Sequence, residues 1–235
     1  MFSRIAPWYD FLNHALSLNI DRSWRRKTAR IVPPSPATDE PILDLCTGTG
    51  DLAFEYDRAA KQTVPIIGAD FCHEMLIRAN EKAVKRGVAD RVRFLEADAQ
   101  HLPFPSDQFQ IVSVSFGLRN ITDPDRGLAE MVRVCRPGGR VAVLEFSRPR
   151  GIIGWFYRAY FRYLLPAIGQ IVSRSPDSAY QYLPASVLAF PDGEALAEKL
   201  RAAGLTDVKY DRFTFGIATL YVGVKPSSCQ PATTS

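Results

Sequence analysis

The sequence predicts an α/β fold in which a largely parallel sheet is covered by helices on both faces. Short apolar strands alternate with amphipathic helices from residue 41 onward, as in repeated strand–helix–strand units. Glycines and prolines separate these segments. The 235-residue chain is 46% hydrophobic, which is ordinary for a globular protein with one sizeable core.

Strands and helices can be placed in order through the central region. Apolar runs rich in Val and Ile predict strands at 42–46, 66–70, 92–96, 111–116 and 140–146. Amphipathic spacing predicts helices at 52–60, 73–86 and 126–134. The Arg-Pro-Gly-Gly block at 136–139 should end the third helix and allow reversal into the next strand, because proline cannot continue a helix.

The remaining segments flank this region, and together residues 1–226 are interpreted as one domain. Residues 1–40 should form a helical preface that ends at a proline-rich hinge, and residues 148–190 a helical insertion. A helix at 192–203 precedes strands at 208–214 and 219–224, an antiparallel pair that closes the sheet edge. The polar tail at 227–235 is expected to be disordered.

The strongest functional signal is a glycine-containing turn after the first strand. Gly48 and Gly50 follow the strand that holds Asp44, and glycine allows a sharp turn and close approach of a ligand. Asp70 ends the next strand, where a carboxylate can accept hydrogen bonds from both ribose hydroxyls. This pattern predicts a nucleoside site, with an ordinary strand-to-helix turn as the alternative.

Departures from a dinucleotide fingerprint indicate which nucleoside binds. Ala53 replaces a third glycine, and Asp51 puts negative charge where a pyrophosphate would lie at the helix N-terminus. A cofactor with a ribose and no phosphate fits better. S-adenosyl-L-methionine is such a molecule, and its ammonium group would favour Asp44.

Further candidates fall on the same rim, because ligands of such sheets bind outside the carboxyl ends of the strands. Asp98 can accept from an adenine amino group while the Ala99 amide meets a ring nitrogen, and Phe71 can pack on the purine. A turn-forming role is the alternative for Asp98. Arg119 and Asn120 follow the fourth strand, beside the expected place of the sulfonium.

Longer blocks resemble the ubiquinone and menaquinone biosynthesis C-methyltransferases along nearly the whole chain. Generic methyltransferases share the glycine turn and the Arg-Pro-Gly-Gly block, whereas few share Phe-Gly-Leu-Arg-Asn at 116–120 together with Tyr-Asp-x-x-Asn at 9–13. The matching blocks are residues 5–10, 43–52, 74–76, 102–105, 115–120, 136–140, 144–147 and 180–184. The chain departs from the pattern at Asn19, Asp21 and Gln110, where the family commonly has Gly, His and Asp.

The resemblance implies a Rossmann-like, S-adenosylmethionine-dependent methyltransferase with a mostly parallel seven-stranded sheet and an antiparallel last strand. It implies methyl transfer to a ring carbon of a polyprenylated quinol, either a demethylmenaquinol, which is favoured, or a methoxy-polyprenyl-benzoquinol. The insertion at 148–190 then lies on the acceptor side. Cofactor contacts matched by position are Thr49, Asp70, Asp98, Ala99 and Ser115, and the substrate-binding candidates are Tyr9, Asn13, Asn120 and Tyr180.

The chemistry favours a reduced acceptor, because a ring carbon is a good nucleophile in a quinol and a poor one in a quinone. Arg119 is the predicted catalytic residue. Its guanidinium stays protonated, so it should position a water or the phenolate rather than act as a base. His14, His73 and His101 are the other titrating groups; lone histidines are usually surface residues, and these three are not spaced as a metal site.

Charge and composition bear on partners and location. The net charge is +4, and basic residues lie among acidic ones, which argues against nucleic-acid binding. Four scattered cysteines and no apolar run of roughly 18 residues predict a cytoplasmic protein. Ile153, Phe156, Tyr157, Tyr160 and Leu164 fall on one helical face and Arg158 and Arg162 on another, which fits a helix on the inner face of a membrane as well as a core helix with a solvated edge. The prenyl chain of the acceptor that the resemblance implies favours the membrane.

Several alternatives stay open at this point. A methyltransferase for another small lipophilic acceptor would share residues 44–50 and would not need the block at 116–120. A non-catalytic nucleic-acid-binding protein is suggested only by a pI near 8.9. Both a monomer and a homodimer agree with the sequence.

Overall fold

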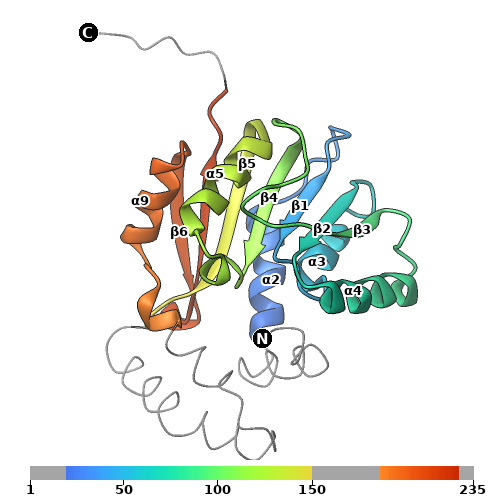
Figure 1. The fold of residues 1–235 in the computed structure, drawn as a ribbon, viewed down its shortest axis with the longest axis horizontal. Helices are drawn as coiled ribbons and strands as arrows, with labels where there is room; N and C mark the ends of the chain where they lie inside the picture. The colour runs from blue at the N-terminus through green and yellow to red at the C-terminus, as the bar shows by residue number, and fades with distance from the viewer. Residues whose placement is uncertain (1–19, 150–185, 228–235) are drawn as a thin grey trace, which may run out of the picture.

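The computed structural model describes residues 20–149 and 186–227, which form a seven-stranded sheet with helices on both faces (Figure 1). The strands are β1 (Ile42–Leu45), β2 (Ile66–Asp70), β3 (Val92–Glu96), β4 (Phe109–Ser115), β5 (Cys135–Phe146), β6 (Thr206–Phe213) and β7 (Ala218–Val224). The helices are α2 (Ile20–Ile31), α3 (Asp51–Ala59), α4 (His73–Arg86), α5 (Pro124–Val134) and α9 (Glu194–Ala202). Short 3₁₀ turns are η1 (Leu118–Asn120) and η3 (Thr214–Gly216).

The strand order is β3-β2-β1-β4-β5-β7-β6. Strands β1 to β5 are parallel, and β7 is antiparallel to both of its neighbours, β5 and β6. The predicted sheet and its antiparallel final pair are confirmed. The order reverses between β1 and β4, and this switch point is where ligands of doubly wound sheets bind.

Two hydrophobic clusters join the sheet to its helices. They lie on opposite faces of the sheet, because successive side chains of a strand point to opposite faces. Ile42 and Ile111 pack with residues of α2 and α3 on one face, and Leu43 and Val112 pack with residues of α5 and α9 on the other. The central strands β1 and β4 are buried on both faces, as expected for a parallel sheet between helices, whereas the edge strands β3 and β6 are more exposed.

The predicted start of β5 is wrong. The strand begins at Cys135, before the Arg-Pro-Gly-Gly block rather than after it. Its pairing with β4 passes from Phe109↔Cys135 directly to Ile111↔Arg140, so residues 136–139 form a bulge inside the strand. Gly138 takes a positive φ of 72° there, which glycine adopts without steric cost. The bounds of β2, β3 and α4 agree with the predicted ones.

Gln110, where the family commonly has Asp, ties β4 to the preceding loop. Its buried side-chain amide donates to the Glu40 carbonyl over 2.7 Å and accepts from the Ser35 amide over 2.7 Å. This role is structural.

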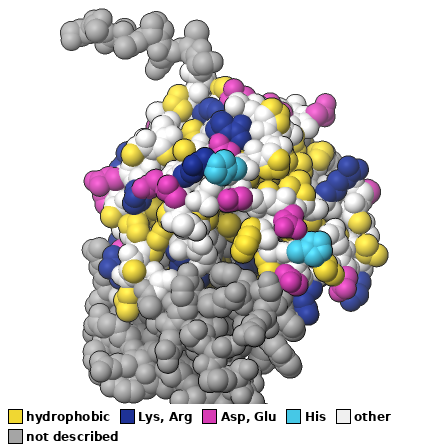
Figure 2. All heavy atoms as spheres, in the orientation of Figure 1, with side chains coloured by type: hydrophobic (Ala, Val, Ile, Leu, Met, Phe, Trp, Pro, Cys, Tyr) yellow, Lys and Arg dark blue, Asp and Glu magenta, His cyan; other side chains and the backbone are white. Residues whose placement is uncertain are grey.

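Several predictions lie outside the described residues: the first part of the preface with Asn19, most of the insertion with its proposed membrane-facing side chains, and most of the tail. Among the described helices, none combines the length and apolar character needed to cross a membrane. Basic and acidic side chains are interspersed over the described part of the face drawn in Figure 2.

Candidate functional site

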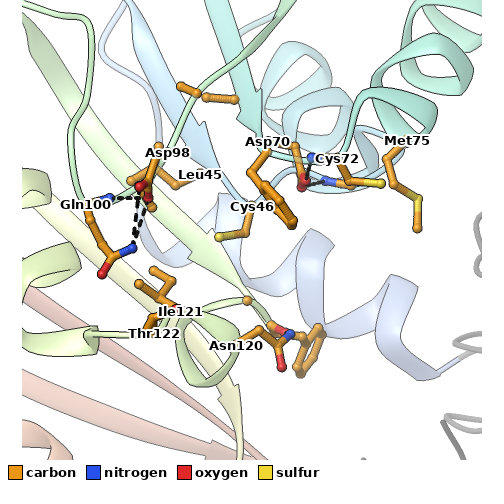
Figure 3. A pocket seen from close by; sticks show the side chains of 17 residues that line it. Leu45, Cys46, Asp70, Cys72, Met75, Asp98, Gln100, Asn120, Ile121 and Thr122 are labelled. Atoms are coloured by element: carbon orange, nitrogen blue, oxygen red, sulfur yellow. Dashed lines mark hydrogen bonds between the residues drawn. The ribbon is translucent and has the colours of Figure 1, made fainter. Parts of the chain in front are cut away.

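A cavity of about 410 Å³ lies at the carboxyl ends of β1, β2, β3 and β4 (Figure 3). Its volume falls within the range of about 300–1,000 Å³ that is typical of small-molecule sites. Six of the predicted site residues line it: Gly48, Asp70, Phe71, Asp98, Ala99 and Asn120.

The glycine turn forms one wall of the cavity with an unusual backbone. Cys46, Gly48 and Gly50 all have positive φ values, of 50°, 56° and 87°. A Cβ atom at Gly50 would lie 2.6 Å from the Phe94 ring, so only glycine fits at this start of α3. Positive φ at a residue such as Cys46 is costly and concentrates at functional sites.

Asp70 holds the glycine turn from the neighbouring strand. Its two carboxylate oxygens accept from the Gly48 amide over 2.8 Å and from the Cys72 amide over 2.9 Å. Desolvation raises the pKa of Asp70 while these amides partly offset the shift. A carboxylate has about four acceptor positions, so it retains capacity for two ribose hydroxyls.

Asp98 stands at the other end of the same wall, after β3. It accepts from the backbone amide of Gln100 over 2.9 Å and from its side-chain amide over 3.2 Å, and the backbone contact lowers the pKa of Asp98. Figure 3 shows this pair and the Asp70–Cys72 pair projecting from neighbouring strand ends. The Asp98–Gln100 contact is a turn of the kind considered as the alternative, and Asp98 also lines the cavity.

Phe71 presents an exposed aromatic ring at the rim of the cavity. The residue is 69% exposed and belongs to the cavity lining. This placement agrees with packing on a planar base.

Asp44 lies behind the cavity rather than in its lining. The residue is 1% exposed, and its carboxylate accepts from the hydroxyls of Thr47 over 2.7 Å and Ser113 over 3.0 Å. Desolvation by burial raises the pKa of Asp44 to about 6, and these hydroxyls oppose that rise.

Three other predicted cofactor contacts, Thr49, Gly50 and Ser115, also lie outside the lining residues. The Thr49 hydroxyl accepts from Lys82 over 2.6 Å, and the same ammonium contacts Asp51 over 3.2 Å. The ammonium group of Lys82 on α4 therefore offsets the negative charge of Asp51 at the start of α3. The Ser115 hydroxyl is buried without a hydrogen-bond partner among the described residues, which leaves it able to meet a ligand or a water.

Arg119 and Asn120 form η1 after β4. Asn120 lines the cavity, whereas Arg119 packs behind it. Arg119 Nη1 donates to Glu145 Oε1 over 2.6 Å and to the Phe116 carbonyl over 2.6 Å. Its Nε is buried without a hydrogen-bond partner among the described residues.

The structure adds site residues that the sequence did not single out. Met75 on α4 and Gln100 after β3 line the cavity, as do Ile121 and Thr122 beyond the Phe-Gly-Leu-Arg-Asn block. The strand-end rule locates Gln100, because it directly follows Asp98 and Ala99, but Met75 comes from a helix and carries no such signal. Tyr9, Asn13 and Tyr180 lie outside the described residues.

A model of the ubiE/COQ5 methyltransferase family matches residues 1–225. A demethylmenaquinone methyltransferase from Deinococcus radiodurans is 48% identical over 227 residues, which cover 96% of this chain and 91% of that protein. A ubiquinone/menaquinone biosynthesis C-methyltransferase from Geobacter sulfurreducens is 42% identical, with 96% and 87% covered. A solved SAM-dependent methyltransferase from Thermotoga maritima shares the fold, with a TM-score of 0.67, 17% identity and coverage of 95% and 98%.

Proposed function

The chain belongs to the ubiE/COQ5 methyltransferase family, and we propose that it transfers a methyl group from S-adenosyl-L-methionine to a ring carbon of a polyprenylated quinol in menaquinone or ubiquinone biosynthesis. The observation that carries the proposal is the match over residues 1–225 together with a cavity at the sheet's switch point. Demethylmenaquinol is the favoured acceptor, because the Deinococcus radiodurans relative is named for it.

The cavity suits this cofactor in charge as well as in size. S-adenosyl-L-methionine supplies an electrophilic methyl group on a positively charged sulfur. Asp70 would hold the ribose hydroxyls, Asp98 and the Ala99 amide would hold the adenine, and Phe71 would cover its face. The negative field of Asp70, Asp98 and Asp44 favours a cationic molecule over a phosphate.

The acceptor would approach from the side of Asn120 and Phe116. A quinol carbon becomes a stronger nucleophile as its phenol loses a proton, and the forming negative charge on oxygen needs a positive neighbour. Arg119 has a donor left at Nε for a water or a phenolate oxygen, and we propose this as its catalytic role. The walls of the cavity would exclude bulk water and fix the in-line geometry of transfer.

The long prenyl tail bears on where the protein works. A polyprenyl chain partitions into a bilayer, with about 0.8 kcal/mol for each buried CH₂. We therefore propose peripheral contact with the cytoplasmic face of the membrane, through the apolar residues of the insertion.

Transfer of a labelled methyl group tests the function. The assay uses a prenylated naphthoquinone and its unprenylated ring, each with and without dithionite. We expect product only with reductant and more with the prenylated acceptor. Equal labelling without reductant would rule out attack by a quinol carbon, and labelling of an oxygen or nitrogen acceptor instead would point to another small lipophilic substrate.

A further inference from the structure

Glu145 at the end of β5 is a buried carboxylate with an unexplained role. Its side chain is 1% exposed, and that of its partner Arg119 is 7% exposed. Besides Arg119 Nη1, the carboxylate accepts from the Phe146 amide over 2.8 Å and from the Arg119 amide over 3.4 Å. A charge this deeply buried requires a paired and hydrogen-bonded partner.

The ion pair reaches the cavity through one carbonyl group. Arg119 Nη1 donates to the Phe116 carbonyl as well as to Glu145, and the Asn120 side-chain amide approaches the same carbonyl at 3.4 Å. Phe116 and Asn120 both line the cavity. A continuous series of direct contacts therefore links Glu145 to the cavity wall.

Phe116 is held in a conformation that it would not adopt alone. Its φ is 58°, a left-handed value that is a genuine outlier for a bulky residue. The ring lies 5.9 Å from Trp24 and 4.4 Å from Phe146, and Arg25 lies 5.4 Å above it. Packing fixes the ring, and the Arg119 contact fixes the carbonyl, so both ends of the strained residue are restrained.

We propose that Glu145 is a positioning residue for methyl transfer, which through its ion pair with Arg119 holds the strained turn at Phe116 and thereby sets Asn120 in the cavity wall that faces the acceptor. The inference rests on the proposed function for its kinetic readout. Its structural readout, the mobility of residues 114–122, is independent of any substrate.

The test compares Glu145→Gln, Arg119→Gln and the double variant. Glutamine keeps the size of glutamate and loses the charge, so the turn should loosen. We expect faster amide hydrogen exchange in peptides covering residues 114–122, kcat lowered by about tenfold or more, and an affinity for S-adenosylhomocysteine within about twofold of the parent. Because both residues act as one unit, the double variant should lose no more kcat than Arg119→Gln alone.

Asp57→Asn is the matched control, since it breaks another ion pair of a buried carboxylate, with partly buried Arg91 at 2.7 Å, away from the cavity lining. It should lower the melting temperature and leave kcat and exchange at 114–122 unchanged. If Glu145→Gln does not fold, the double variant leaves no buried unpaired charge and carries the test. Unchanged exchange at 114–122, or kcat losses that multiply in the double variant, would overturn the proposal. Absent quinol methylation in the parent would refute the proposed function, and the exchange result would still decide whether Glu145 holds the turn at Phe116.

Discussion

The carboxylates at the carboxyl edge of the sheet are held in two different ways. Asp70 and Asp98 lie in the cavity wall and accept from backbone amides: Asp98 from Gln100, and Asp70 from Cys72 and from Gly48 in the turn after the neighbouring strand. Asp44 and Glu145 lie behind the wall, and each accepts from the side chain of a distant residue, Ser113 and Arg119 respectively, as well as from nearer groups. Asp70 and Asp98 keep acceptor positions that face the cavity, whereas the oxygens of Asp44 and Glu145 accept from groups of the protein itself.

The difference separates binding from support. Asp98 is fixed within its own turn, so its loss should have little effect on the rest of the fold, whereas Asp70 also holds the turn at Gly48. A buried carboxylate that depends on distant donors links strands, and its ionisation is costly. We expect changes at the wall to affect cofactor affinity and changes behind it to affect stability or turnover.

The largest expected effect is the pH dependence that Asp44 gives to stability. Its pKa is raised from 3.8 to about 6 in the folded protein, so between these values the folded state holds the proton and the unfolded state does not. Stability from this group therefore falls as the pH rises through that window. The shift corresponds to about 3 kcal/mol, because one pKa unit is worth about 1.4 kcal/mol.

Urea unfolding of Asp44→Asn between pH 4 and 7 measures this contribution. The variant should gain stability relative to the parent as the pH rises. Asp90→Asn, at an exposed carboxylate, should follow the parent's profile. If the Asp44→Asn and parent curves stay parallel, then burial does not raise the pKa of Asp44.

Asp70→Ala is expected to give the next largest effect, on affinity. The change leaves two backbone amides and the ribose hydroxyls without an acceptor, which costs about 1–3 kcal/mol. Affinity for S-adenosylhomocysteine by calorimetry should fall about 10- to 100-fold. Glu96→Ala, at the next strand end but outside the cavity lining, should leave it unchanged; a similar loss in both variants would show that overall charge, and not contact, is responsible.

Gly117→Ala probes whether the β4 side of the cavity depends on tertiary packing. An added Cβ would lie 2.3 Å from Cys46 Cβ, and overpacking of this kind costs about 1–3 kcal/mol. Cys46→Gly should restore much of the stability, because it removes the clashing atom and suits a φ of 50°. At Gly87, nothing lies within 4 Å of an added Cβ. Gly87→Ala therefore measures the cost of a positive φ alone, which is the part of the Cys46→Gly gain that does not come from the clash. A melting temperature no better in the Cys46/Gly117 double variant than in Gly117→Ala would exclude the clash as the cause.

The smallest expected effect is that of Phe71→Ala at the exposed rim. An aromatic contact contributes about 0.5–1.5 kcal/mol, so affinity for S-adenosylhomocysteine should fall severalfold. The melting temperature should not change, since the ring is exposed in the free protein. A lower melting temperature with unchanged affinity would place Phe71 among the supporting residues instead.

Local pattern predicted most of the fold, and long-range pairing limited the rest. The bounds of β2, β3 and α4 could be placed because an apolar run or an amphipathic period ends at a turn signal. The start of β5 could not, because the bulge at 136–139 exists only through its register with Phe109 and Ile111. The proline and glycines at 136–139 indicated an interruption of regular structure, but not that β5 pairs with β4 on both sides of it.

The same limit applies to the site. The strand-end rule placed Asp70, Asp98 and Asn120 around one cavity, because the parallel order of the strands determines which ends meet. The pairing of Arg119 with Glu145 and of Lys82 with Asp51 joins residues 26 and 31 positions apart, and nothing in the local sequence announces either. Whether any of these site residues contacts a ligand stays a prediction.

The place of β7 has a consequence for how the chain is synthesised. It is the last strand in the described chain, yet it lies between β5 and β6 and pairs with both. During synthesis, one edge of β5 therefore stays unpaired until Ala218–Val224 has been made. Open strand edges recruit other chains, and long-range pairing forms slowly. We therefore expect nascent molecules of this protein to pass through an aggregation-prone stage, and a premature stop before β7 to give an insoluble product rather than a smaller enzyme.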